Sequence, residues 1–179
     1  MDEQKQTDVA PEQRAPRGTL FVLYGYGYLM RMEVERFLQT LELTPVIVRD
    51  ETIRGKTIAD LFEIHTDVAF VIVLLSADDE IVRRELNVVQ LGGFGRDLLK
   101  LPDPPEKRWR VHQETLFEWG YCAAKVEPGR IAVLYHPDVA LPFETEAARY
   151  IRWDAQGAWH RLLAEKMKAA GLDVDLFSY

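Results

Sequence analysis

The segment His112–Cys122 carries the residues whose types and spacing could support a reaction. Its Glu118 stands among apolar and aromatic neighbours, which are Leu116, Phe117, Trp119 and Tyr121. If this segment is a helix, these neighbours partly desolvate the Glu118 carboxylate, and Glu114 lies one turn away as a like charge. Both effects favour the protonated form of one of the two carboxyl groups. The spacing taken alone nevertheless favours an ordinary solvated glutamate on a helix.

Glycines mark three further positions. Gly55-Lys56-Thr57 ends like a phosphate-binding P-loop, but Asp50 stands where that motif needs its first glycine, so Thr57 is better read as a helix N-cap. Gly25-Tyr26-Gly27 lies between a predicted strand and helix, but Met30 replaces the third glycine of a dinucleotide motif, which favours a plain tight turn. Gly120 lies mid-helix at a cost of about 1 kcal/mol, which predicts that another group approaches it closely.

Other reaction classes lack their characteristic residues. There is no Gly-x-Ser-x-Gly elbow, and no histidine has a serine or cysteine partner in a nucleophile motif; the histidines are His65, His112, His136 and His160. One cysteine and four scattered histidines offer no close ligand pair, so we expect no metal. Cys122 cannot form an intramolecular disulfide, which indicates a reducing, cytoplasmic location.

The composition is that of one globular domain. The chain has 179 residues, 47% of them hydrophobic, and a formal net charge of −7. This charge argues against nucleic acid as the main partner, although backbone amides can still bind a small anion. The longest apolar run, Val68–Leu75, has the length of one strand and not the roughly 20 residues of a membrane span. Residues 1–18 are polar and predict a disordered leader, which leaves 19–179 as the domain.

The periodicity of the apolar residues predicts the elements that would position these groups. Strands are expected at Thr19–Tyr24, Pro45–Val48, Val68–Leu75, Ile131–Tyr135 and, more weakly, Arg149–Trp153. A first helix has the stripe Met30, Val34, Phe37 and Leu41, and a second opens at Thr57 with Ile58, Leu61 and Phe62 on one face. The last helix has one apolar side, formed by Trp159, Leu162, Leu163, Met167 and Ala170, and ends at Gly171. Arg49–Lys56 is expected to be a polar loop.

This alternation predicts an α/β fold with a mostly parallel five-stranded sheet and helices on both faces. Ligands of such sheets bind beyond the carboxyl ends of the strands, here at Tyr24–Tyr28, Asp50–Thr57, Ser76–Glu80 and Tyr135–Asp138. The pattern is weaker between Asp78 and Val111. There Asp79–Leu91 could be a helix, Gly92–Gly95 a break and Leu101–Pro105 an extended loop, together forming a lid or a contact surface.

From Leu20 to about Asp175 the chain resembles the bacterial TIR-like predicted nucleotide-binding family. The resemblance rests on several stretches in the same order: Leu20–Gly25, Val34–Val48, Gly55–Ile58, Val68–Asp79, Glu118–Tyr121 and Ala169–Asp173. Members of that family are NAD⁺-degrading effectors of cyclic-nucleotide-triggered antiphage systems. The resemblance implies a flavodoxin-like TIR fold and assigns the catalytic role to Glu118, which overrides the ordinary reading of that residue.

The implied reaction breaks the nicotinamide–ribose bond of NAD⁺ through a transition state that resembles an oxocarbenium ion. A carboxylate beside the ribose would stabilise that charge. NAD⁺ is then a substrate, and no cofactor is expected. Substrate-binding residues are expected at both glycine-containing turns and at one possible aromatic wall: Tyr24, Gly25, Tyr26, Gly55, Lys56, Thr57 and Trp119.

The sequence departs from the family pattern at two positions. Tyr24 replaces a common histidine, and Glu114 replaces an asparagine before the catalytic glutamate. Three functions therefore stay open: an NAD⁺ glycohydrolase or cyclase, a non-catalytic TIR signalling module, and a nucleoside deoxyribosyltransferase-like enzyme. The first is preferred, with activity that depends on homo-oligomers formed through TIR–TIR contacts and with a separate protein as sensor of the trigger.

Overall fold

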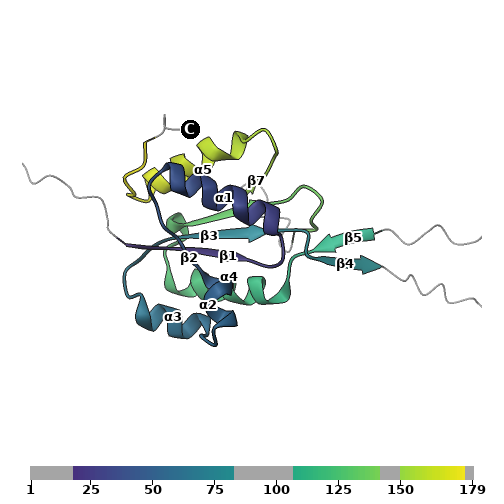
Figure 1. Cartoon of the computed structure of the whole chain (residues 1–179), viewed down its shortest axis with the longest axis horizontal. Helices are drawn as coiled ribbons and strands as arrows, with labels where there is room; N and C mark the ends of the chain where they lie inside the picture. Colours follow the sequence, from purple (N-terminus) through teal and green to yellow (C-terminus); the bar gives the residue numbers. More distant parts are fainter. Residues whose placement is uncertain (1–17, 83–106, 142–149, 176–179) are drawn as a thin grey trace, which may run out of the picture.

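A computed structural model gives the fold and describes residues 18–82, 107–141 and 150–175. Its centre is a five-stranded sheet in the order β2-β1-β3-β6-β7, and every pair of neighbouring strands is parallel (Figure 1). The strands are β1 (Thr19–Tyr24), β2 (Val46–Ile47), β3 (Val68–Leu75), β6 (Ile131–Tyr135) and β7 (Ile151–Arg152). The predicted parallel α/β sheet is confirmed, although β2 and β7 are shorter than the strands expected at Pro45–Val48 and Arg149–Trp153.

The strand order defines where a ligand can bind. From β1 the chain goes outward to β2 and then returns to β3 on the other side of β1, as in flavodoxin-like folds. The winding therefore reverses between β1 and β3, and ligands of such sheets bind outside the carboxyl ends at this switch point. Tyr24 ends β1 and lies opposite Leu74 near the end of β3. The crevice beyond these two strand ends is the expected binding edge.

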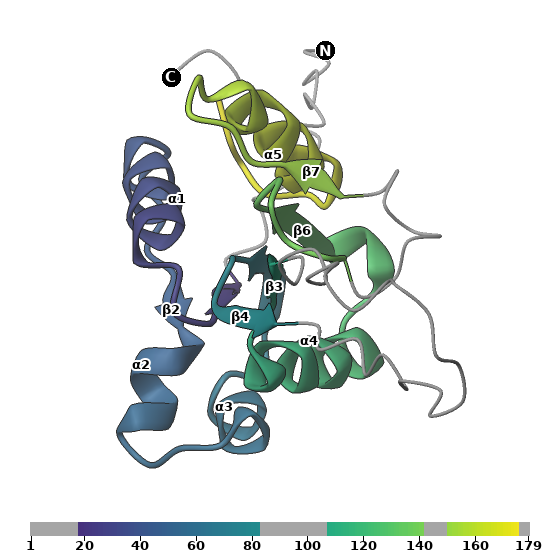
Figure 2. The ribbon, with the colours of Figure 1, turned by 90° about the vertical axis from the view of Figure 1, so that its right-hand side faces the viewer.

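Helices cover both faces of the sheet (Figures 1 and 2). One face carries α1 (Tyr28–Thr40) and α5 (Ala158–Ala169), and the other carries α2 (Val48–Ile53), α3 (Ile58–Ile64) and α4 (Gln113–Lys125). Successive strand residues point to opposite faces, so Val22 and Ile72 pack under α1 and α5 while Phe21 and Val71 pack on the other side. This double covering explains why β1 and β3 consist almost wholly of buried apolar residues.

The apolar stripes of the two helices on the first face are largely as predicted. Met30, Val34 and Phe37 of α1 are buried. On α5 the buried residues include Trp159, Leu163 and Met167, but Leu162 is 44% exposed, so its expected place on the apolar side is wrong. The chain turns after α5 at Gly171, whose φ of +92° is the left-handed conformation of a C′ glycine.

The segment after β2 is not the polar loop that its composition predicted. Val48 is buried and begins α2, a short helix that takes up most of Arg49–Lys56. The turn into α3 passes through Gly55 at φ +90°. The Thr57 hydroxyl then accepts a hydrogen bond from the Asp60 backbone N–H at 3.2 Å, and the Asp60 carboxylate accepts one from the Thr57 N–H at 2.7 Å. The predicted capping box is thus confirmed.

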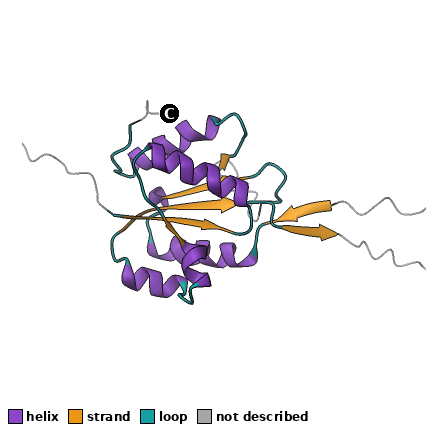
Figure 3. Ribbon diagram, viewed as in Figure 1, coloured by secondary structure: helices purple, strands orange, loops and turns teal. Residues whose placement is uncertain are grey.

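A small antiparallel ribbon leaves the carboxyl edge of the main sheet (Figure 3). It pairs β4 (Asp79–Val82) with β5 (Lys107–Arg110), so the prediction of a helix beginning at Asp79 is wrong. Strand β5 is tied to the loop after β6, because the Trp109 carbonyl accepts a hydrogen bond from the Ala140 N–H at 3.0 Å. Val111 then leads into α4. The expected Gly92–Gly95 break and Leu101–Pro105 loop lie outside the described residues.

The remaining element is a short 3-10 helix, Pro128–Arg130, which joins α4 to β6. Residues 1–17 lie outside the described ranges, so the expected leader is not tested. Within the described ranges, none of the helices has the length and apolar character needed to cross a bilayer.

Candidate active site

Glu118 lies on the buried face of α4. That helix packs against β1 and β3, and its buried stripe consists of Thr115, Glu118 and Cys122. Glu118 is only 7% exposed, and no side chain of the described residues donates a hydrogen bond to its carboxylate. The α4 helix therefore places a buried acid in the layer against β1 and β3, the two strands that flank the switch point.

The environment of Glu118 raises its pKa to about 7. Burial is the largest cause, the charge of Glu114 adds to it, and the charge of Arg49 acts in the opposite direction. The expected raised pKa and the contribution of Glu114 are therefore confirmed. The expected source of the burial is partly wrong, because Phe117 is 68% exposed. The expected close approach of another group to Gly120 is also wrong, because a Cβ added there would have no neighbouring heavy atom of the described residues within 4 Å. The face of α4 that carries Glu118 packs against β1 and β3, and Leu116, Trp119 and Tyr121 are partly buried beside the same core.

One cation and two rings gather around Glu114, one turn before Glu118. The Arg49 guanidinium lies 4.2 Å from the centroid of the Tyr26 ring, and its Nη1 is 3.7 Å from Glu114 Oε2. The His112 ring meets the same Tyr26 ring edge-on at 4.7 Å between centroids, and its Nδ1 is also 3.7 Å from Glu114 Oε2. The Tyr26 ring thus contacts both groups that reach toward Glu114.

The Asp78 carboxylate joins three segments at the switch point. Its Oδ1 accepts hydrogen bonds from the Tyr26 N–H at 2.8 Å and from the Ser76 hydroxyl at 2.7 Å. Its Oδ2 accepts one from the His112 N–H, the N-cap of α4, at 3.3 Å. A Cβ at Gly25 would lie 2.1 Å from Asp78 Oδ2, and one at Gly27 would lie 2.2 Å from Ser76 Cβ. Both glycines are therefore required for this close packing.

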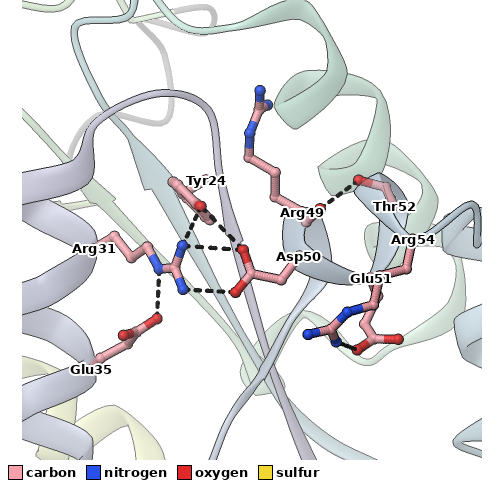
Figure 4. A network of polar contacts seen from close by, with 8 residues as sticks. All are labelled: Tyr24, Arg31, Glu35, Arg49, Asp50, Glu51, Thr52 and Arg54. Carbon is pink, nitrogen blue, oxygen red and sulfur yellow. Dashed lines mark hydrogen bonds and ion pairs between the residues drawn. The ribbon is translucent and has the colours of Figure 1, made fainter.

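Tyr24 belongs to a separate network between α1 and α2 (Figure 4). Its hydroxyl accepts a hydrogen bond from Arg31 Nη1 and donates one to Asp50 Oδ1 at 3.4 Å. Arg31 also pairs with Asp50 at 2.7 Å and with Glu35 at 2.6 Å. Burial is the largest cause of the raised pKa of Tyr24. The hydroxyl is thus occupied by protein groups, and a substrate-binding role for Tyr24 stays a prediction.

The other expected binding residues also have local partners. In the Gly55–Thr57 turn, the Lys56 ammonium pairs with Glu51 Oε2 at 2.6 Å, and the threonine is taken up by the capping box. Trp119 is partly buried and meets the Tyr150 ring edge-on at 5.8 Å between centroids. These local contacts do not test a role in substrate binding, so the binding roles of the turn and of Trp119 stay predictions.

Of the predicted residues, Tyr26 contacts Arg49 and His112, the two groups beside Glu114, and Gly25 packs closely against Asp78. Two further residues, Arg49 and Asp78, were missed as individual functional candidates. Asp78 lay within a segment noted for following a strand, whereas Arg49 was assigned to a loop. Among the described residues, no three histidine, cysteine or carboxylate side chains are grouped closely enough to hold a metal ion.

The fold and site together define a flavodoxin-like α/β domain with a buried glutamate on the helix that packs against β1 and β3. Comparison with known families makes this assignment specific: residues 19–155 match the model described as "CAP12/Pycsar effector protein, TIR domain". The chain therefore belongs to this TIR-domain family, which confirms both the expected resemblance and the expected TIR fold.

Among curated proteins, the chain is similar to the "Uncharacterized protein YuaY" of Escherichia coli (strain K12). The two are 28% identical over 157 residues, which cover 87% of this chain and 46% of that protein. The chain thus spans about half the length of the curated relative. No solved structure matches it significantly.

Proposed function

We propose that this TIR domain is an NAD⁺ glycohydrolase of an antiphage effector and that Glu118 is its catalytic residue. The supporting observation is a glutamate that is 7% exposed, lies on the helix that packs against β1 and β3, and has a pKa of about 7. Groups with strongly perturbed pKa values are concentrated at functional sites. Membership in the effector family supports the same assignment.

The proposed step is hydrolysis of the bond between ribose C1′ and the nicotinamide nitrogen. The bonding pair leaves with the nicotinamide, which becomes neutral, so no general acid is needed. Positive charge develops on the ribose, and the Glu118 carboxylate stabilises it in a site where burial strengthens the interaction. Water then bonds to C1′, and the proton that it loses passes to Glu118, which gives ADP-ribose.

Protonation of Glu118 is compatible with this role. A pKa of about 7 leaves about half of the groups ionised at neutral pH. A bound nicotinamide cation beside the carboxylate favours the ionised form further. The substrate therefore helps to generate the charged state that the reaction requires.

The exposed apolar side chains on α1 favour a second candidate, a non-catalytic module that works through contacts with other copies. Tyr28, Leu29 and Met32 are 65%, 62% and 47% exposed at the start of this helix. The same surface suits an enzyme that is active only when copies assemble. A separate sensor protein would then control assembly.

Nicotinamide release from NAD⁺ by concentrated protein, followed by chromatography, tests the proposal. We expect turnover in the natural chain and its loss in Glu118→Gln. The matched control is Glu127→Gln, because Glu127 is 81% exposed just beyond α4 and the charge change is the same. Failure of the natural chain to release nicotinamide, even with a crowding agent that promotes assembly, would favour the non-catalytic module. Nucleobase release from deoxynucleosides would instead indicate a deoxyribosyltransferase-like enzyme.

A further inference from the structure

The cations near the switch point differ in how tightly carboxylates hold them. Arg31 forms an ion pair with Asp50 at an N–O distance of 2.7 Å. Arg54 and Lys56 each form an ion pair with Glu51 at 2.6 Å. Arg49 is different, because the nearest carboxylate oxygen of the described residues lies 3.7 Å away on Glu114. Arg49 is therefore the least neutralised cation of this set.

The Arg49 guanidinium is held in place but retains unused donors. Its side chain is only 17% exposed and rests on the Tyr26 ring at 4.2 Å. Figure 4 shows it turned away from the Asp50 carboxylate and from the Arg31 network. No nitrogen of the Arg49 guanidinium donates a hydrogen bond to another described residue. None of these nitrogens is a fully buried atom that lacks a hydrogen-bond partner. A planar guanidinium with free donors is suited to a phosphate or carboxylate.

Glu114 forms only a loose ion pair with the Arg49 guanidinium. Its side chain is 72% exposed, and its oxygen lies 3.7 Å from Arg49 and from His112, beyond hydrogen-bond distance of both. An ion pair whose charges lie beyond hydrogen-bond distance, and whose carboxylate is mostly exposed to solvent, contributes little and is readily exchanged. Glu114 can therefore leave Arg49 when a stronger anion arrives, without disturbing the fold.

From this geometry we propose that Arg49 binds the diphosphate of a dinucleotide and that Glu114 competes with the substrate for it. The inference rests on the proposed function for the identity of the substrate. Glu114 and Glu118 lie on one side of α4, four residues apart, so a diphosphate that displaces Glu114 is one helical turn from the catalytic carboxylate. The opposing effects of Arg49 and Glu114 on the pKa of Glu118 support this common location.

Displacement has a second consequence. When the diphosphate binds the Arg49 guanidinium, the Glu114 side chain moves into solvent and no longer bridges Arg49 and His112. Tyr26, which contacts both, keeps its ring as a platform beside the bound ligand. The ligand class that fits is an anionic dinucleotide or a nucleoside diphosphate sugar, and an uncharged nucleoside lacks the group that Arg49 recognises.

Equilibrium binding of ADP-ribose, measured by calorimetry on the full chain, tests the inference without requiring turnover. We expect Glu114→Gln to bind ADP-ribose about threefold to tenfold more tightly than the natural chain, and Arg49→Met about tenfold more weakly. Adenosine binding should change in neither variant. Arg49→Lys, which keeps the charge at the same place, should recover part of the affinity.

Glu127 and Arg130 provide the matched controls. They form a similarly loose pair at 3.8 Å beyond the far end of α4, so Glu127→Gln and Arg130→Met repeat both charge changes away from the site. Equal ADP-ribose affinity in all variants would overturn the inference and leave the proposed hydrolysis intact. Absence of ADP-ribose binding in both the natural chain and Glu114→Gln would also overturn it. Binding with the expected pattern but no nicotinamide release would support the inference and contradict the proposed activity.

Discussion

The Asp78 carboxylate accepts a hydrogen bond from the backbone N–H of Tyr26 at 2.8 Å, so a residue just past β3 fixes the turn that follows β1. The same carboxylate accepts a hydrogen bond from the backbone N–H of His112 at the start of α4. One side chain therefore holds the Tyr26 turn and the Glu118 helix in a common frame. The geometry of the candidate site depends on this carboxylate although it does not touch Glu118.

We expect Asp78→Asn to lower the free energy of unfolding by about 1 to 3 kcal/mol, because a carboxylate with three donors is replaced by an amide that brings a donor of its own. Urea denaturation measures this change. Asp138→Asn is the control, since that carboxylate is 69% exposed. If both variants had equal stability, Asp78 would not hold the three segments together.

Glu118→Gln is expected to stabilise the domain above neutral pH. The pKa of Glu118 is raised from 4.5 to about 7, so the folded state retains a proton that the unfolded state has lost between these two values. Natural-chain stability therefore falls as pH rises through this window, by at most about 3 kcal/mol. Glutamine removes the dependence. Urea denaturation at pH 4 and pH 8 should show similar stability at the lower pH and a more stable variant at the higher pH.

The pH dependence of NAD⁺ cleavage provides a third prediction. If ionised Glu118 carries the reaction, kcat/KM should rise with pH and level off above an apparent pKa near 7. Removing the charge of Glu114 should move the inflection to lower pH, because that charge raises the pKa of Glu118. Measurement of initial rates from pH 5 to pH 9 in the natural chain and in Glu114→Gln tests this shift; an unchanged inflection would assign the titration to another group.

Thr57→Ala separates a helix cap from a substrate-binding residue. Loss of the capping box should destabilise the domain by about 1 kcal/mol, because the Asp60 backbone N–H loses its partner. If capping is the only role of Thr57, the KM for NAD⁺ should not change. An increase in KM together with normal stability would restore the phosphate-binding role predicted from Gly55-Lys56-Thr57.

The elements that could be predicted from the sequence are those that burial dictates. Val68–Leu75 is apolar at every position because helices cover both of its faces, and the spacing of Thr57 and Asp60 is itself the capping signal. The α2 helix was missed because its six residues are mostly polar and show too little periodicity. Phe117 was misjudged because adjacent helix residues point in different directions, so it is exposed while Glu118 is buried.

The site was predictable only in part for a different reason. Glu118 was identified through its resemblance to a family motif, and its raised pKa agrees with the local charge of Glu114. Arg49 and Asp78 acquire their roles through partners that are 23 and 52 residues distant, at Tyr26 in both cases. Such pairings are set by the strand order, which brings the ends of β1 and β3 together, and no local pattern encodes them.

The strand order also has a consequence for protein synthesis. Tyr26 and Glu118 are separated by 92 positions in the chain, and the site between them needs α4 packed on β1 and β3. A growing chain on the ribosome therefore cannot form the site until α4 has been made and has left the exit tunnel. If the domain consumes NAD⁺, each copy is inactive during most of its own translation. The cell that makes the protein then meets the activity only after the domain has folded.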